Sequence, residues 1–214
     1  GPLVKGSELD RRMLMLCIFE NHYHEAINLY KNTDFLSFFD RDDEERYEIR
    51  HIFLKTLRDS DCHILDINTQ RLSRYLLLMV SRYQAGFPIS LTQNQRKYIR
   101  RFREYSVAKD VIEKCQRFSG FDVSEDEILA FALLLIFWAD IPWDCDLSQN
   151  YFELHDEAQD FISLFCKSIK KDYNLDITTI PGWSQILCAG IIPMLVQKDF
   201  NASFHSVRSL HFEE

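Results

Sequence analysis

Glycine and proline are scarce in this sequence, whose 214 residues include only six of the former and five of the latter. Both residues interrupt regular structure, so their scarcity argues against many short strands with tight turns and favours long helices. No stretch reaches the roughly 18 uncharged apolar residues needed to cross a bilayer. The longest apolar run, Ile128 to Ala139, is bounded by acidic residues, so we expect a buried helix there and no membrane association.

The motifs of common enzyme chemistry are also missing. The sequence has no Gly-rich phosphate loop, no nucleophile elbow, no H-E-x-x-H and no recognisable pair of catalytic carboxylates. The acidic run from Asp42 to Glu45 is typical of a helix start, where negative charge is favoured. We therefore predict that the chain is not an enzyme, with no catalytic residues and no cofactor.

The cysteines and histidines do not form a metal-binding pattern. No C-x-x-C pair occurs, and His22 and His24 are two residues apart, so on a helix they point in different directions. Cys62 and His63 form a lone adjacent pair, whereas zinc needs clustered ligands. We expect thiols buried in the core of a cytoplasmic protein, and no metal site. The six cysteines are Cys17, Cys62, Cys115, Cys145, Cys166 and Cys188.

Apolar residues are abundant, at 46% of the chain with 14% aromatic, which is enough for a substantial core. Their spacing of three and four residues predicts an all-α fold of about eight helices in one or more bundles. Ser124-x-x-Glu127 reads as a capping box ahead of the apolar run. Residues 174–182 hold the one plausible extended segment, and 140–150 a connector. The predicted helices span residues 7–30, 44–58, 69–85, 92–105, 107–118, 124–138, 151–171 and 184–198.

The formal net charge is −8, but the charges are segregated along the chain. Between Arg71 and Gly120 there are eleven basic residues against three acidic ones; between Phe121 and Asp160 there are eleven acidic residues and no Lys or Arg. The two blocks are either solvated helix faces or complementary surfaces, between packed subdomains or between subunits. A basic patch in the predicted helix over residues 92–105 is a candidate interface or phosphate contact, and consists of Arg96, Lys97, Arg100, Arg101 and Arg103.

The segment from Arg71 to Ile89 resembles the phosphotransferase-system regulation domain, or PRD, of sugar-responsive antiterminators and activators. In that family a helix carries a phosphorylatable histidine, an arginine seven residues later and a glycine four beyond it. Arg82 and Gly86 match this arginine and glycine, and Glu127-Ile matches the family's Glu-Ile before an apolar run and a second histidine. Residues 186–198 resemble more weakly the corresponding helix of a second such domain.

The family histidines are absent. The first position is Tyr75, the second is Leu134, and the equivalent position in the weak second copy is Gly190. Leucine and glycine cannot accept a phosphoryl group, so these are degenerate phosphohistidine positions. Control by phosphotransferase-system proteins through these positions is therefore doubtful, and Leu134 reads as a packing residue.

Divergent domains of this kind resemble the Mga- and AtxA-like virulence regulators of Gram-positive bacteria. Gly6-Ser-Glu8 and the residues up to Arg12 resemble the segment that leads, in that group, from a helix-turn-helix region into the regulation domains. The opening Gly-Pro-Leu is typical of a protease scar. We therefore assign residues 1–6 to scar and linker, 7–140 to a first PRD-like domain, and 141–214 to a second, partial or divergent one.

The resemblance implies a homodimer that holds two DNA-binding modules at a fixed spacing, with DNA contacted only through a missing N-terminal region. We expect Arg96 to Arg103 of one subunit to face acidic residues 122–127 or 140–146 of another. Two alternatives remain open. Residues 19–30 resemble one helix pair of a peptide-sensing tetratricopeptide repeat, although no repeat of about 34 residues follows. Abundant aromatic residues could also line a small-ligand pocket.

Overall fold

The computed structural model describes residues 6–21, 43–62, 64, 66–138 and 156–183, together with the single residues 187, 191, 194, 198 and 200. Within these residues the chain is all-α, as predicted, and contains no β-strand. A 3-10 helix, η1 (Ile177–Thr179), follows the last long helix. The α-helices are α1 (Glu8–Asn21), α4 (Asp43–Asp59), α5 (Asp66–Gln84), α6 (Gln93–Ile99), α7 (Arg103–Ser119), α8 (Glu125–Trp138) and α10 (Asp156–Tyr173).

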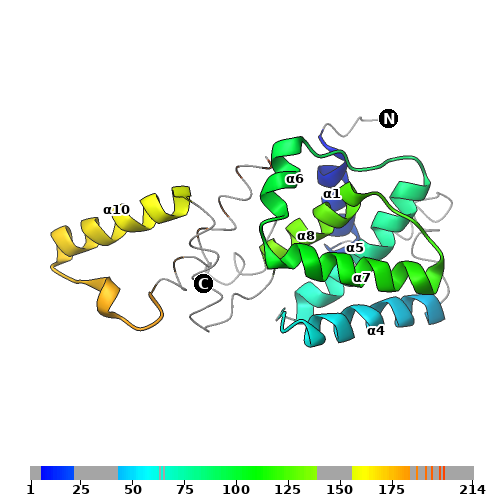
Figure 1. Ribbon diagram of the computed structural model, residues 1–214, viewed down its shortest axis with the longest axis horizontal. Helices are drawn as coiled ribbons and strands as arrows, with labels where there is room; N and C mark the ends of the chain where they lie inside the picture. The colour runs from blue at the N-terminus through cyan, green and yellow to red at the C-terminus, as the bar shows by residue number, and fades with distance from the viewer. Residues whose placement is uncertain are drawn as a thin grey trace.

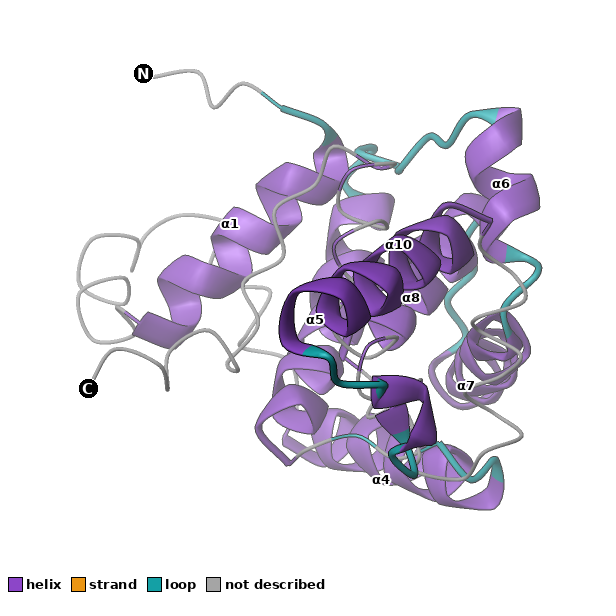
Figure 2. Ribbon diagram, turned by 90° about the vertical axis from the view of Figure 1, so that its left-hand side faces the viewer, coloured by secondary structure: helices purple, strands orange, loops and turns teal. Residues whose placement is uncertain are grey.

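Helix α8 is the centre of a bundle formed by α1 and α4 to α8 (Figures 1 and 2). Every residue from Leu129 to Trp138 is buried, as expected for a helix that is apolar on all sides. It packs against α5, α6 and α7, while α4 packs against α5 and α7, and α1 against α5. The apolar run identified in the sequence is therefore the innermost element of this bundle.

Two local signals fix the α5–α6 connection, which lies beside α8. Gly86 follows α5 with φ of 82°, a left-handed conformation that glycine adopts without strain, and the Phe87 amide donates to the Arg82 carbonyl. At the other end Thr92 and Gln95 form a capping box that starts α6. Residues 87–91, which lie between the end of α5 and the start of α6, therefore follow a defined path across the end of the bundle.

Two expectations about helix boundaries are wrong. The helix expected over 92–105 is divided, because α6 ends at Ile99 and α7 begins at Arg103. Phe102 is extended at this break, with φ −89° and ψ 144°, and both Ile99 and Phe102 are buried. The break lets α6 and α7 run in different directions (Figure 1) while Ile99 and Phe102 both enter the core.

The capping box predicted at Ser124 is also wrong, although α8 begins at the next residue. The Ser124 hydroxyl has no hydrogen-bond partner, and the Glu127 carboxylate binds Arg12 and the Ile89 amide instead. Likewise, the expected extended segment is the turn η1, because Asp176 accepts hydrogen bonds from the amide and hydroxyl of Thr178. In the first case the helix starts where it was predicted but without the side-chain cap; in the second the side-chain bonds of Asp176 stabilise a turn.

Helix α10 and η1 lie apart from the bundle, at the opposite end of the long axis of the molecule (Figure 1). They pack against each other, with Ile162 buried and Trp183 partly buried nearby. None of the described helices is long and apolar enough to span a membrane. The predicted connector 140–150, most of the helix expected over 184–198, residues 22–30 and the proposed domain boundary at 140 lie outside the described residues, as do Gly190 and His63.

Candidate functional site

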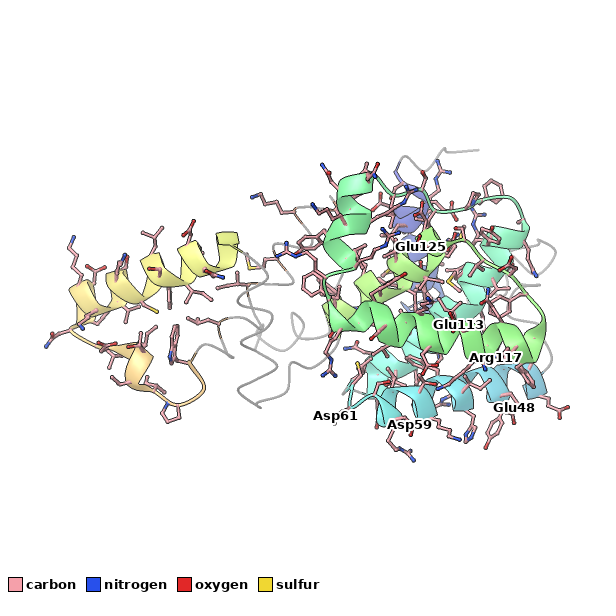
Figure 3. The ribbon with its side chains drawn as sticks, viewed as in Figure 1. Glu48, Asp59, Asp61, Glu113, Arg117 and Glu125 are labelled. Carbon is pink, nitrogen blue, oxygen red and sulfur yellow. The ribbon has the colours of Figure 1, made fainter. Side chains whose placement is uncertain are left out.

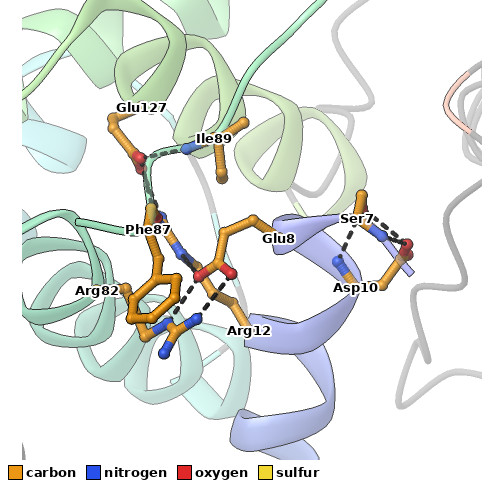
Figure 4. A network of polar contacts seen from close by, with 8 residues as sticks. All are labelled: Ser7, Glu8, Asp10, Arg12, Arg82, Phe87, Ile89 and Glu127. Atoms are coloured by element: carbon orange, nitrogen blue, oxygen red, sulfur yellow. Dashed lines mark hydrogen bonds and ion pairs between the residues drawn. The ribbon is translucent and has the colours of Figure 1, made fainter. Parts of the chain in front are cut away.

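The most elaborate polar arrangement in the described residues surrounds Arg12, whose side chain is fully buried (Figure 4). Its guanidinium donates two hydrogen bonds to Glu127, one of them 3.0 Å long from Nη2 to Oε1. Nε donates to Glu8 Oε1 at 3.1 Å, and Nη2 donates to the Phe87 carbonyl at 2.9 Å. One cation from α1 is therefore shared between α8, the segment after α5, and its own helix.

A second arginine completes this network. Arg82, near the end of α5, donates to both oxygens of Glu8, at 2.7 and 2.8 Å. Its guanidinium carbon lies 4.0 Å from the centre of the Phe87 ring, a cation–π contact. Glu127 accepts a further bond of 2.8 Å from the Ile89 amide. The network consequently ties α1, α5, α8 and residues 87–89 together.

Burial without partners would be very costly for these charges, because a buried ion leaves its hydration shell. Here both carboxylates have two or more donors, and their charges balance those of the two arginines. Burial raises the pKa of Glu8, but hydrogen bonds from Arg82 and Arg12 outweigh it, so the pKa is lowered overall. Burial likewise opposes the charge of Arg12, yet Tyr75, Glu127 and Glu8 raise its pKa. Glu8 and Arg12 are therefore both charged at neutral pH.

Tyr75 and Leu134, the positions that the sequence aligned with phosphorylatable histidines, are both completely buried. The Tyr75 ring stacks on Phe131, with centroids 6.3 Å apart and planes 11° apart. Its hydroxyl has no hydrogen-bond partner, and burial raises its pKa despite the nearby Arg12. Both side chains are core residues, and neither is open to solvent.

The structure brings Arg82 and Glu127, two of the three family-motif residues, into one network, and places Gly86 at the turn beside it. Glu8 and Arg12 were not identified as site residues from the sequence, where they appeared only as part of a connecting segment. Their spacing of four residues, with acid before base, was the available signal, since such pairs face each other on a helix. Nothing in that spacing indicated that α8 would supply the second carboxylate.

The basic patch is largely used within the chain. Arg96 binds Asp126 at 2.6 Å, and Arg100 binds Glu125 at 2.6 Å (Glu125 is labelled in Figure 3). Arg103 donates to the Asp61 carbonyl at 2.7 Å, while Lys97 and Arg101 are exposed. The expectation that Arg96 and Arg100 face residues 122–127 of another subunit is therefore wrong: they pair with the first turn of α8 in the same chain. The pKa of Asp126 is lowered chiefly by Arg96.

A second buried acid, Glu104, lies in the first turn of α7 and has no such partner. One carboxylate oxygen is 4.0 Å from Arg103 Nε, and the other has no hydrogen-bond partner. Burial raises the pKa of this carboxyl to about 7. The neighbouring Cys62 thiol is also buried, which raises its pKa to about 11 and makes it a poor nucleophile at neutral pH.

The remaining features of a ligand site are few in the part of the chain that the structure describes. No group of three or more His, Cys, Asp or Glu side chains there could hold a metal ion. A hollow of about 370 Å³ lies between α10 and η1, where Lys170 and Asp176 form an ion pair of 2.7 Å beside Trp183. Its walls combine polar and apolar groups, including Gln159 and Ile162.

Comparison with known proteins gives one match. The family model described as PRD domain matches residues 51–138, which run from within α4 to the last residue of α8. The matched region contains Tyr75, Arg82, Glu127 and Leu134 but not Glu8 or Arg12. No curated protein and no solved structure matches the chain.

Proposed function

We propose that this chain is a non-catalytic regulatory domain of a bacterial transcription regulator, of the PRD type, which acts as a homodimer without phosphorylation at the family's histidine positions. The match to the PRD family supports the regulatory assignment. The observation that carries the rest is the complete burial of Tyr75 and Leu134. A phosphoryl donor has to reach its acceptor atom, and here one acceptor is an enclosed tyrosine and the other a hydrocarbon.

The buried network supports a mechanical role for the same region. In phosphorylation-controlled domains, an added phosphate creates charge-assisted bonds to arginine. In this chain Arg12 and Arg82 already have carboxylate partners in Glu8 and Glu127. The helices are thus held together by permanent internal charges. On this proposal α1, which comes first among the described helices, follows a helix-turn-helix region. A change in the arrangement of the bundle would then alter the position of that region through α1.

Loss of the phosphate acceptors favours the Mga- and AtxA-like virulence regulators of Gram-positive bacteria over sugar-responsive antiterminators as the parent group. The signal would then act on the geometry or stability of a dimer, since a ligand shifts an equilibrium only by its difference in affinity for two states. Phosphotransferase-system proteins would not be direct partners through Tyr75 or Leu134. The setting would be the bacterial cytoplasm, with DNA bound only by the upstream region.

A fusion experiment tests the regulatory and dimeric assignment. The whole chain is placed after a DNA-binding domain that represses its operator only as a dimer, and repression of a reporter is measured in bacterial cells. We expect repression well above that of the DNA-binding domain alone, and Arg12→Met in the bundle should reduce it. A fusion that is present at normal amounts but represses no better than the bare domain would contradict the proposal.

A second experiment tests the phosphorylation claim. The purified chain is incubated with labelled phosphoenolpyruvate, the phosphotransferase-system enzyme that transfers its phosphoryl group to the histidine phosphocarrier, and that phosphocarrier, beside a PRD with intact histidines. We expect no label on Tyr75, whereas the control becomes labelled. Stoichiometric label mapped to that residue would overturn this part of the proposal and leave the dimer unaffected.

The hollow between α10 and η1 supports one alternative, a small-ligand-binding domain. A volume of about 370 Å³ is within the range of small-molecule sites, and Lys170, Asp176 and Trp183 offer charge and an aromatic face. A thermal-shift screen with sugars, sugar phosphates and apolar compounds tests it. A saturable shift that Trp183→Ala abolishes would favour this alternative.

A further inference from the structure

Helix α10 exposes a row of large apolar side chains. Leu164 is 64% exposed and Phe161 53% exposed, and Phe165 lies beside them. The two phenylalanine rings stack on each other, with centroids 6.3 Å apart. The opposite side of the helix, marked by Ile162 and Cys166, faces η1 and Trp183. The row therefore points away from the partners that α10 already has.

Charged residues flank this row in a definite order. Asp160 precedes Leu164 by four residues, and Lys167 and Lys171 follow it by three and seven. At about 100° per residue all three lie on one side of Leu164, within roughly 60° of it, while Phe161 and Phe165 lie on the other side. All three are exposed, and none of the described residues forms an ion pair with them. We call this set of six residues the α10 face.

The α10 face is self-complementary when two copies run antiparallel. Leu164 is near the middle of the 18-residue helix, so a two-fold axis beside it brings the two Leu164 side chains together. Rotation about that axis leaves the charged residues of both copies on the same side of the interface and reverses their order along the helix. Asp160 of one copy then lies opposite Lys167 and Lys171 of the other, twice over, and the phenylalanines of both copies cover the leucines.

We propose that the α10 face is the surface through which two copies of this chain associate, antiparallel and about a two-fold axis at Leu164. A parallel pair about a two-fold axis along the helices would instead place this charged flank against the phenylalanine flank of the other copy and form no such ion pairs, and an unrelated partner would not need this symmetry. The inference goes beyond the proposed function and rests on the homodimer expected there. It also accounts for the separation of α10 from the bundle, because a projecting helix can reach a second copy.

The first test removes the apolar centre. The dissociation constant of the whole chain is measured by sedimentation for the unaltered protein and for Leu164→Asp, which would bring two carboxylates together at the axis. We expect the constant to rise at least about a hundredfold, since two buried leucines are replaced by facing like charges. Tyr47→Asp on α4, at a side chain 69% exposed, is the matched control and should leave the constant unchanged.

The second test reverses the charges. Asp160→Lys would place lysine opposite lysine at two symmetric points and raise the dissociation constant about tenfold; Lys167→Asp would do the same with like acids. The double variant Asp160→Lys/Lys167→Asp should recover the original constant. Lys55→Asp on α4, at an exposed lysine, is the control for a change of net charge.

The outcomes separate the two proposals. A dimer that all of these α10 variants leave intact would overturn the α10 face while preserving the homodimer of the proposed function. An unaltered chain that stays monomeric at high concentration would overturn both. Helical content and the unfolding transition of each variant, if unchanged, show that a lost dimer reflects the surface and not the fold; rescue by the double variant shows this independently.

Discussion

The bundle and the α10–η1 unit differ in the sequences of their helices, since α8 is apolar on all sides and α10 is amphipathic and charged. In the bundle, α8 has no exposed residue from Leu129 to Trp138, and polar groups at its start are matched by arginines from α1 and α6. Helix α10 is of comparable length, but most of its described side chains are exposed; Figure 3 draws them as sticks. A helix that is apolar on all sides is thus enclosed in the core, whereas an amphipathic helix leaves one side exposed.

The polar groups follow the same division. In the bundle, pairs such as Arg12 with Glu127 join segments that are far apart in sequence, beside pairs four residues apart such as Lys114 with Asp110. In the α10–η1 unit the described ion pair joins Lys170 to Asp176, six residues away. Long-range pairs constrain the tertiary fold, whereas local pairs only support a turn. We therefore expect changes in the bundle to affect folding, and changes on α10 to affect association.

The largest difference should appear in hydrogen exchange. Amides of α8 exchange only when the whole bundle unfolds, which costs roughly 5 kcal/mol or more, whereas α10 can open locally. Below the dissociation constant of the dimer, we expect α10 amides to exchange at least about a hundredfold faster than those of α8. Exchange resolved by peptide mass spectrometry measures this. Equal protection of both helices in the monomer would show that they form one cooperative unit.

Breaking the Arg12 network should cost the bundle most. In Arg12→Met the Glu127 carboxylate is left buried with only the Ile89 amide as a donor, and we expect the free energy of unfolding to fall by about 3–5 kcal/mol. Urea denaturation followed by circular dichroism measures it. Adding Glu127→Gln should recover part of the loss, because the stranded charge is removed.

The same change on the exposed side of the bundle provides the control. Arg100→Met breaks the exposed pair with Glu125 and should alter the free energy of unfolding little. If Arg12→Met is as mild as Arg100→Met, the buried network does not hold the helices together.

Glu104 should make the bundle less stable as pH rises. The folded protein keeps this proton up to about pH 7, whereas the unfolded chain releases it near the ordinary value of 4.5. The free energy of unfolding therefore falls between these two pH values, by on the order of 2–3 kcal/mol, and the full cost remains above pH 7. Glu104→Gln should remove this dependence. The measurement is urea denaturation of both proteins at pH 4.5 and pH 8; parallel curves would refute it.

The smallest effect is expected at Tyr75 when only its hydroxyl is removed. Its buried hydroxyl has no partner, so Tyr75→Phe should leave the protein equally stable or more stable by about 1 kcal/mol. Tyr75→Ala would instead leave a cavity and cost about 3–5 kcal/mol. Thermal unfolding distinguishes the two. A clear loss of stability in the phenylalanine variant would mean that the Tyr75 hydroxyl makes a hydrogen bond in the folded protein.

Much of the bundle was predictable because its signals are local. Few glycines and prolines, apolar spacing of three and four, and one long apolar run led to the all-α fold and to the buried helix ending at Trp138. The division between α6 and α7 and the cap at Ser124 were not predictable. In both, a distant group competes with the local pattern: core burial of Phe102 in one, and Arg12 with Ile89 in the other.

The sequence by itself determined that the chain is helical, that α8 is buried, and that no histidine stands at residues 75 and 134. These follow from residue type and periodicity, which act over one or two helical turns. Only the tertiary structure decided that Glu8, Arg12, Arg82 and Glu127 meet, and that Arg96 and Arg100 pair within the chain. Such encounters depend on where helices cross, and a crossing is fixed by the packing of the whole core, which no short stretch of sequence contains.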